Sequence, residues 1–299
     1  MRTPPHYMPA LITPFDEDGD IIFEAHYHNV NLQVERGVIG LLIGGSTGEG
    51  PYLEPGERKR LLHETRLQLG ADVYLACGVA AQSVRQANAQ VQEIAEGGAD
   101  AALVITQTTL ARGNHEAIKR FFEAVAEATP IPLILYSVPA VTGYELPVDV
   151  AAALSEHPSV IAIKDSGGRP VHMKEIVQAT TDDFMVFAGS SSTLGQAMAA
   201  GANGAITASG NYVPELVSSL VLTSRSSVSD ADPMQRRLTE ATKEIEAFGV
   251  VGTKTAAAAA GLWTGIPRKP LQPIARTQLA RIAQLVAVAR ESADALAIR

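Results

Sequence analysis

A lysine at the end of an apolar run is the residue of this sequence best suited to chemistry. Residues 159–168 read SVIAIKDSGG, and the apolar, mostly β-branched run 160–163 leads directly to Lys164. Such a run suits a strand that is buried on both faces, as in a parallel sheet covered by helices. Loss of water favours the neutral, nucleophilic amine, which forms a Schiff base with a carbonyl substrate. The alternative is that Lys164 lies one residue beyond the strand and extends into solvent.

Polar groups also follow other apolar runs. Tyr136 begins the segment YSVPAVTG, and its phenol could move protons as an acid or a base. Alternatively, its ring fills the core and its hydroxyl binds a carbonyl. Ser46 and Thr47 lie in the glycine-rich segment GGSTGEG, whose backbone N–H groups suit a carboxylate, although a flexible loop is the alternative. This segment lacks the Lys-Ser/Thr of a phosphate-binding P-loop.

The apolar runs recur at intervals of roughly 30 residues, the length of a strand–helix unit. They cover residues 8–12, 38–45, 73–79, 101–106, 132–136, 160–163, 184–189 and 204–207, and a helical pattern follows each one. This pattern predicts an α/β fold, a (β/α)₈ barrel, with a doubly wound open sheet as the alternative. Because a barrel collects the carboxyl ends of its strands at one mouth, we expect Lys164, Tyr136 and Ser46 to lie together there.

The pattern changes after the eighth unit. We expect residues 1–224 to form the barrel and residues 225–299 to form a helical extension packed on it. The polar stretch SRSSVSDADP connects the two, and helices are predicted at 234–248, 252–262 and 278–290.

The composition of the chain argues against several classes of protein and of site. The net charge of -8 argues against a nucleic-acid-binding surface or a polybasic membrane contact. A single cysteine, Cys77, allows no intrachain disulfide and is expected to be a small buried side chain. Neither a membrane-spanning run nor a signal-peptide pattern is present, which predicts a cytoplasmic protein. His26 and His28 are interpreted as a surface pair on a helix rather than as metal ligands.

Three motifs, in this order and at this spacing, resemble one family. GSTGE at 45–49, YSVPAVTG at 136–143 and IKDSGG at 163–168 are similar to motifs of the dihydrodipicolinate synthase / N-acetylneuraminate lyase family of class I aldolases. Within it, they look most like those of 4-hydroxy-2-oxoglutarate aldolases. The resemblance implies that Lys164 is the Schiff-base lysine, that Tyr136 and Ser46 move protons, and that Ser46 and Thr47 hold the pyruvate carboxylate. The other residues that it places at the substrate are Gly45, Gly189, Ser190 and Ile206. It implies no metal or cofactor, and a homotetramer built as a dimer of dimers.

Two departures from the family pattern bear on the substrate. Thr109 and Leu110 occupy the place of a tyrosine pair that completes a proton relay in many members. Val141 occupies the place of an arginine that binds the second substrate's carboxylate in dihydrodipicolinate synthases, and its absence removes a bidentate contact.

We therefore expect a class I lyase acting on 2-oxo acids such as pyruvate, similar to 4-hydroxy-2-oxoglutarate or 2-keto-3-deoxy sugar acid aldolases. One alternative is dihydrodipicolinate synthesis from pyruvate and aspartate semialdehyde. Another is a 2-oxo acid binding protein without catalysis. A metal-dependent aldolase is disfavoured because the histidines are scattered.

Overall fold

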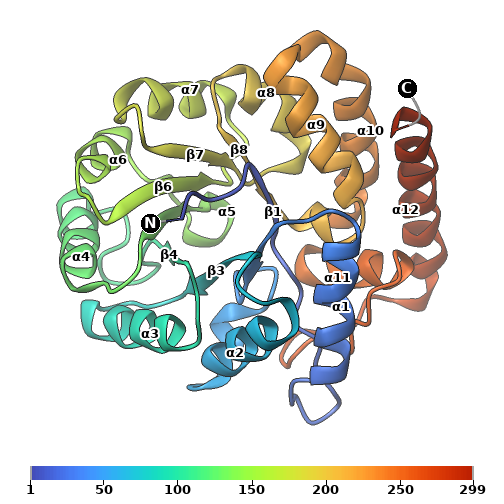
Figure 1. The fold of residues 1–299 in the computed structure, drawn as a ribbon, viewed down its shortest axis with the longest axis horizontal. Helices are drawn as coiled ribbons and strands as arrows, with labels where there is room; N and C mark the ends of the chain where they lie inside the picture. The colour runs from blue at the N-terminus through green and yellow to red at the C-terminus, as the bar shows by residue number, and fades with distance from the viewer. Residues whose placement is uncertain (1, 298–299) are drawn as a thin grey trace.

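Eight parallel strands form the centre of the molecule, and the helices surround them (Figure 1). The computed structural model describes residues 2–297, except for the side chains of residues 228 and 292–297. The strands are β1 (Tyr7–Pro9), β2 (Gly40–Ile43), β3 (Tyr74–Val79), β4 (Ala101–Ile105), β5 (Leu133–Ser137), β6 (Val160–Asp165), β7 (Met185–Ala188) and β8 (Gly204–Thr207). Neighbours in the chain pair in parallel from β2 to β8, and β8 pairs with β1. A single bridge, Ala10 to Leu42, joins the ends of the sheet, so the predicted (β/α)₈ barrel is confirmed in a nearly closed form.

The helices between the strands agree closely with the predicted pattern. They are α1 (Phe23–Glu35), α2 (Glu57–Leu69), α3 (Val84–Glu96), α4 (His115–Ala128), α6 (Val148–Ser155), α7 (Pro170–Ala179), α8 (Leu194–Ala199) and α9 (Pro214–Ser226). Ser83 and Asn114 cap α3 and α4 by accepting the N–H groups of Gln86 and Ala117. Such caps satisfy amides that have no partner within the helix.

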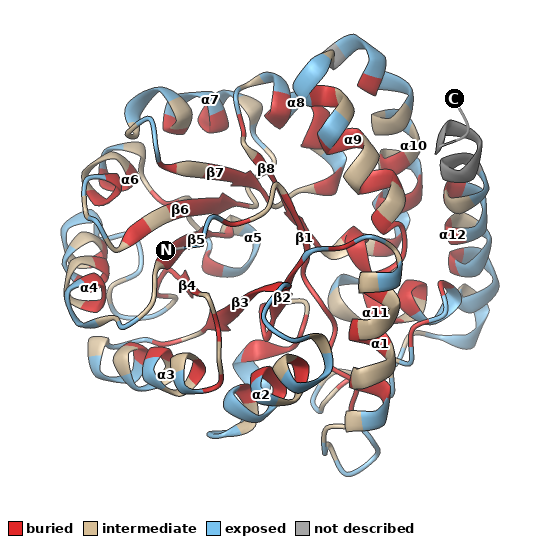
Figure 2. Ribbon diagram, in the orientation of Figure 1, coloured by how far each residue is buried: buried red, intermediate tan, exposed pale blue. Residues whose placement is uncertain are grey.

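Buried residues form two layers. The larger one lies between the strands and the helices, while a smaller set fills the inside of the barrel; Figure 2 shows the strands as almost wholly buried. Cys77 belongs to the larger layer and is fully buried, as expected, and burial raises its pKa to about 12. Side chains thus fill the inside of the barrel, as is usual for this fold, so the barrel is not an open channel.

Three helices follow the barrel: α10 (Val228–Glu246), α11 (Gly249–Ala259) and α12 (Arg276–Ala297). The expectation that residues 224–233 are a polar connection was wrong for most of its length, because α10 begins at Val228. Ala231 is buried, and α10 packs along α9, so packing outweighs the polar composition there. The division at residues 224 and 225 stays a prediction; only Ser227 separates α9 from α10.

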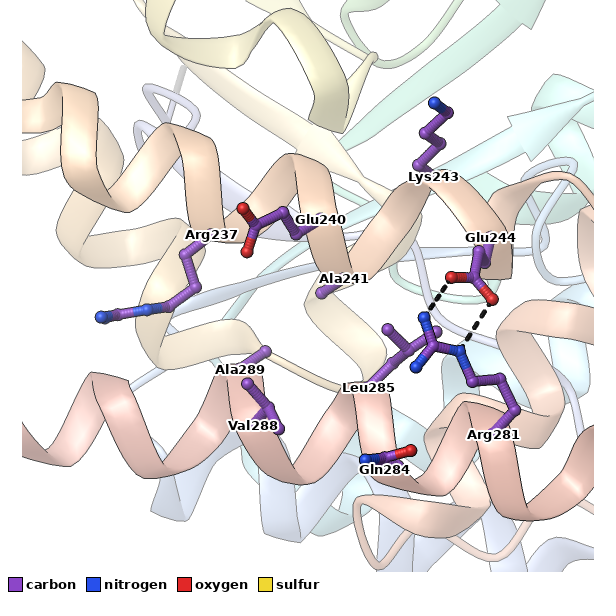
Figure 3. A pocket seen from close by; sticks show the side chains of 10 residues that line it. All are labelled: Arg237, Glu240, Ala241, Lys243, Glu244, Arg281, Gln284, Leu285, Val288 and Ala289. Carbon is purple, nitrogen blue, oxygen red and sulfur yellow. Dashed lines mark hydrogen bonds and ion pairs between the residues drawn. The ribbon is translucent and has the colours of Figure 1, made fainter.

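A groove of about 400 Å³ runs between α10 and α12, outside the barrel (Figure 3). Leu285, Val288 and Ala289 line its apolar part, and Arg281 closes one end by pairing with Glu244. None of the predicted site residues contributes to this groove.

The interpretation of His26 and His28 as a surface pair was wrong. His26 is buried and contacts Thr65 Oγ1 through Nε2 at 2.7 Å, and His28 stacks on Trp263 with ring centroids 4.4 Å apart. Within residues 2–297, no helix combines the length and the apolar character needed to cross a bilayer.

Candidate active site

Lys164 and Tyr136 are neighbours in the barrel wall. They stand directly opposite each other in the register of β5 and β6, and the Nζ atom of Lys164 lies 4.5 Å from the centre of the Tyr136 ring. Both residues are only 5% exposed. Strand β6 continues through Asp165, so Lys164 lies within the strand and does not extend into solvent as the alternative proposed.

A cavity of about 260 Å³ opens at the carboxyl ends of the strands. The predicted residues that line it are Ser46, Thr47, Tyr136, Lys164, Gly189 and Ser190. The others are Val138, Ala140, Ser166, Ala208, Glu246, Gly249, Val250 and Thr253. The structure therefore brings an amine, a phenol and several hydroxyls to one mouth, which is the arrangement that the motifs predict.

Two predicted residues lie outside this cavity. Gly45 lines a smaller neighbouring space of about 20 Å³, which shares Ser46 and Tyr136 with the main cavity. Ile206 is fully buried among the side chains that fill the barrel. Gly45 and Ile206 each lie next to residues at the carboxyl ends of the strands, but neither of them lines the cavity.

Gly189 is a glycine because two side chains of the cavity occupy the space beside it. A Cβ atom at this position would lie 3.0 Å from Cε of Lys164 and would overlap Oγ of Ser166. The backbone at the end of β7 therefore packs directly against the lysine. This contact restricts the positions that the amine can adopt.

The turn after β2 is held by residues far away in the chain. Glu49, the last residue of the GSTGE motif, has a positive φ of 57° and a buried carboxylate. That carboxylate pairs with Nζ of Lys254 in α11 at 2.5 Å and accepts the backbone N–H of Arg268 at 2.7 Å. Burial lowers the pKa of Lys254, and Glu49 opposes this shift. Lys254 belongs to the predicted extension, and this pair was not predicted, since nothing local signals a partner so distant in the chain.

A second acidic residue that was not predicted from the sequence lies at the mouth itself. Glu246, in the last turn of α10, lines the cavity, and its Oε1 accepts a hydrogen bond from Ser191 Oγ at 2.6 Å. Ser191 Oγ also lies 2.9 Å from Ser209 Oγ, which donates to Thr207 Oγ1 at 3.0 Å. Burial raises the pKa of Glu246, and the bond from Ser191 partly offsets this. In sequence, Glu246 looks like any acidic residue of a polar helix.

Asp165 points away from the cavity, because successive side chains of a strand alternate in direction. Its Oδ1 accepts the N–H of Gly167 at 2.5 Å, and its Oδ2 lies 3.5 Å from Nε2 of the buried His172 in α7. Burial raises the pKa of Asp165, although the Gly167 bond and His172 act in the opposite direction. Asp165 thus fixes the turn that carries Ser166 into the cavity.

The positions that depart from the family pattern lie outside the cavity. Thr109 donates its hydroxyl to Oε1 of Gln82 at 2.8 Å, whereas Leu110 and Val141 are exposed. Arg112, from the same loop as Thr109, lays its guanidinium against Gly143, at the end of the short helix α5 (Pro139–Thr142). None of these four side chains lines the cavity.

Comparison with known proteins agrees with this geometry. Residues 4–289 match the profile of the Dihydrodipicolinate synthetase family. The chain belongs to this family. It is 30% identical over 275 residues to the 4-hydroxy-tetrahydrodipicolinate synthase of Exiguobacterium sp., covering 91% of this chain and 94% of the relative. The corresponding protein of Methanosarcina mazei is 31% identical over 288 residues, covering 92% and 95%.

Solved structures of the family have the same fold. The chloride-inhibited dihydrodipicolinate synthase of Acinetobacter baumannii, complexed with pyruvate, superposes with a TM-score of 0.88 at 26% identity, over 95% of this chain and 98% of that one. The 4-hydroxy-tetrahydrodipicolinate synthase of Methylacidiphilum fumariolicum superposes with a TM-score of 0.90 at 25% identity, over 97% and 98%. Members of the dihydrodipicolinate synthetase family are lyases, and this chain is a lyase of the class I aldolase type.

Proposed function

We propose that this lyase forms a Schiff base with 2-oxo acids and makes or breaks the bond that joins pyruvate to an aldehyde. The observation that carries the proposal is the buried amine of Lys164 beside the ring of Tyr136, in a cavity that also holds Ser46 and Thr47. In the cleavage direction, the neutral amine attacks the C2 carbonyl, and loss of water leaves an iminium.

The iminium then accepts the electron pair of the C3–C4 bond. As this bond breaks, the C4 hydroxyl loses its proton to Tyr136, with Ser46 in the relay, and an aldehyde leaves. The remaining enamine takes a proton at C3, and water hydrolyses the iminium to release pyruvate and the free amine. The hydroxyls and backbone N–H groups at Ser46 and Thr47 hold the carboxylate. Every step uses groups of this chain, so the proposal includes no metal or cofactor.

Trapping with borohydride tests the mechanism. Reduction in the presence of pyruvate should attach the three-carbon fragment to Lys164, as located by peptide mass. Lys164→Ala should lose both the adduct and all turnover while keeping its circular dichroism. Lys174→Ala, which removes an exposed lysine from α7, should behave as the parent does. Turnover by Lys164→Ala would overturn the proposal.

Dihydrodipicolinate synthesis is the second candidate function. The names of the relatives favour it, and the exposed guanidinium of Arg112 could reach a carboxylate near α5. Against it, Val141 stands where the resemblance expects an arginine. Efficient condensation of pyruvate with aspartate semialdehyde, lost in Arg112→Ala, would establish this reaction. Pyruvate binding without turnover of any 2-oxo acid would instead establish a binding protein.

Assembly and location stay predictions from the resemblance and the sequence. We propose a homotetramer in the cytoplasm. Sedimentation equilibrium of the purified chain tests the first part, since a monomer at micromolar concentration would contradict it.

A further inference from the structure

We propose that Glu246 selects the aldehyde half of the substrate, and that this half is an uncharged hydroxyaldehyde rather than an aldehyde that carries a carboxylate. The inference rests on the proposed function, because it assigns the part of the substrate that lies beyond the pyruvyl unit. It makes the extension outside the barrel responsible for specificity, since Glu246 belongs to α10.

The charges around the cavity are few. Among its lining residues, Lys164 is the one cation and Glu246 the one carboxylate, while the remaining polar groups are the phenol of Tyr136 and uncharged hydroxyls. Once the neutral amine of Lys164 has bonded to C2 and water has left, the positive charge is that of the iminium, and it lies at the pyruvyl end of the substrate. A carboxylate at the far end of the substrate would therefore find no cation on the wall. Because Ser46 and Thr47 already hold the pyruvyl carboxylate in this proposal, a carboxylate at the far end would have neither a cation nor that turn as a partner, and removing an unpartnered charge from water is unfavourable.

Glu246 adds repulsion to this lack of a partner. Its Oε1 is fixed by Ser191, and the structure describes no bond to its Oε2 from the part of the chain it covers. Among the described residues, no ion pair joins Glu246 to a cation. Burial is the main cause of its raised pKa, and the hydrogen bond from Ser191 acts in the opposite direction. A carboxylate at the aldehyde end would face the like charge of ionised Glu246 in addition to that of the pyruvyl carboxylate.

Hydroxyl groups, in contrast, fit this wall well. A carboxylate oxygen with no protein donor accepts a substrate O–H, and such charge-assisted bonds are stronger than neutral ones. Thr253 of α11 lies on the same wall, and Ser166 and Ser190 provide further hydroxyls around the cavity. A short chain of hydroxyl groups therefore satisfies the cavity where a carboxylate does not. The substrate class is a 3-deoxy-2-oxo acid with an uncharged, hydroxylated end.

Arg112 is the cation outside the cavity that could favour an anionic substrate. Its guanidinium lies on Gly143 and is exposed, and it does not line the cavity. A charge screened by solvent outside the cavity contributes little to binding inside it. The geometry thus favours Glu246 as the group that discriminates between substrates.

Two aldehydes of equal carbon number test the inference. Glycolaldehyde carries CH₂OH where glyoxylate carries a carboxylate, and each is condensed with pyruvate by the purified enzyme. We expect the parent to have a kcat/KM at least about tenfold higher for glycolaldehyde. Glu246→Gln should lower this preference by about tenfold, while its borohydride adduct with pyruvate forms in the same yield. Glu240→Gln, which removes an exposed charge from the same helix, should keep the parent's preference.

The outcomes separate the two proposals. If the pyruvate adduct forms and the parent prefers glyoxylate, the inference about Glu246 is overturned while the Schiff-base function stands. An unchanged preference in Glu246→Gln overturns it as well. If Glu246→Gln does not fold, the test uses the kcat/KM ratio of glycolaldehyde to glyoxylate for the parent and for Glu246→Asp. A preference of the parent for glycolaldehyde that Glu246→Asp retains supports the inference, and a preference of either protein for glyoxylate overturns it. If no adduct forms in the parent, the proposed function fails, and the inference fails with it.

Discussion

Lys254 and Glu49 form a buried ion pair that joins the C-terminal extension to the turn after β2. The Nζ and Oε1 atoms lie 2.5 Å apart, and the two side chains are 4% and 0% exposed. Lys254 also donates to the carbonyl of Ile266 at 2.8 Å. Since Glu49 follows Ser46 and Thr47 in the same turn, the pair links α11 to the residues that we propose hold the substrate's carboxylate.

Lys254→Met should destabilise the protein by about 3–5 kcal/mol, because it leaves the Glu49 carboxylate buried without a counter-charge. Urea unfolding followed by circular dichroism measures this. The double variant Lys254→Met with Glu49→Gln should recover part of the loss, since it also removes the uncompensated charge. Lys174→Met, at an exposed lysine, is the control and should change stability by less than about 0.5 kcal/mol. An equally stable Lys254→Met would show that the pair is unimportant for folding.

Gly189→Ala should lower the rate of pyruvate adduct formation by about a hundredfold, because the added Cβ displaces Lys164 and Ser166. Borohydride trapping at several times measures the rate. Gly195→Ala, where the added carbon meets only the flexible Gln235 side chain at 3.3 Å, should react as the parent does. Normal trapping by Gly189→Ala would mean that the contact with Lys164 does not position the amine.

Glu246→Gln should stabilise the protein at alkaline pH. Burial raises the pKa of Glu246 above its ordinary value, so the folded state binds this proton more tightly than the unfolded state does. The carboxyl therefore contributes most at low pH, and that contribution is lost as the pH rises through the raised pKa. Because the amide does not ionise, the advantage of the variant should grow over the same pH range. Unfolding free energies at pH 4.5 and 8 test this, and a constant difference would contradict it.

His26 should make the fold sensitive to acid. Burial lowers its pKa from 6.5 to about 4, so the folded state binds fewer protons and stability falls as the pH drops from 6.5 to 4. The loss attributable to this residue is about 3 kcal/mol. His26→Gln, which can still donate to Thr65, should remove that part of the pH dependence. Parallel pH profiles for the parent and the variant would argue against the assignment.

The parts of the structure that depend on local pattern could be predicted from the sequence. Apolar runs are local signals, so the strands followed from them, and so did the expectation that Lys164 and Tyr136 lie together at the ends of β6 and β5. The end of β6 was placed too early, because Lys164 and Asp165 read as polar although both are buried in the strand. Strand pairing and burial, rather than residue type, decide such ends.

The charged residues around the mouth could not be predicted in this way. Glu246 and Lys254 belong to predicted helices of the extension, where nothing in the local pattern distinguishes them. The same holds away from the mouth for His26, which was expected at the surface of a helix. His26 and Lys254 are buried and Glu246 is half-buried, each against an element distant in the chain: Thr65 for His26, the turn with Glu49 for Lys254, and Ser191 for Glu246. The sequence carries no local sign of these contacts, since the partner belongs to another part of the fold.

The outer wall of the cavity, made by Glu246, Gly249, Val250 and Thr253, has a consequence for how new activities could arise. The amine and the phenol stand on barrel strands, whereas this wall stands on helices that take no part in the sheet. Exchanging residues of α10 and α11 could therefore redirect the lyase to other aldehydes without rebuilding its reaction centre. Those four positions are therefore the ones to randomise in an engineering experiment, with Lys164 and Tyr136 held constant.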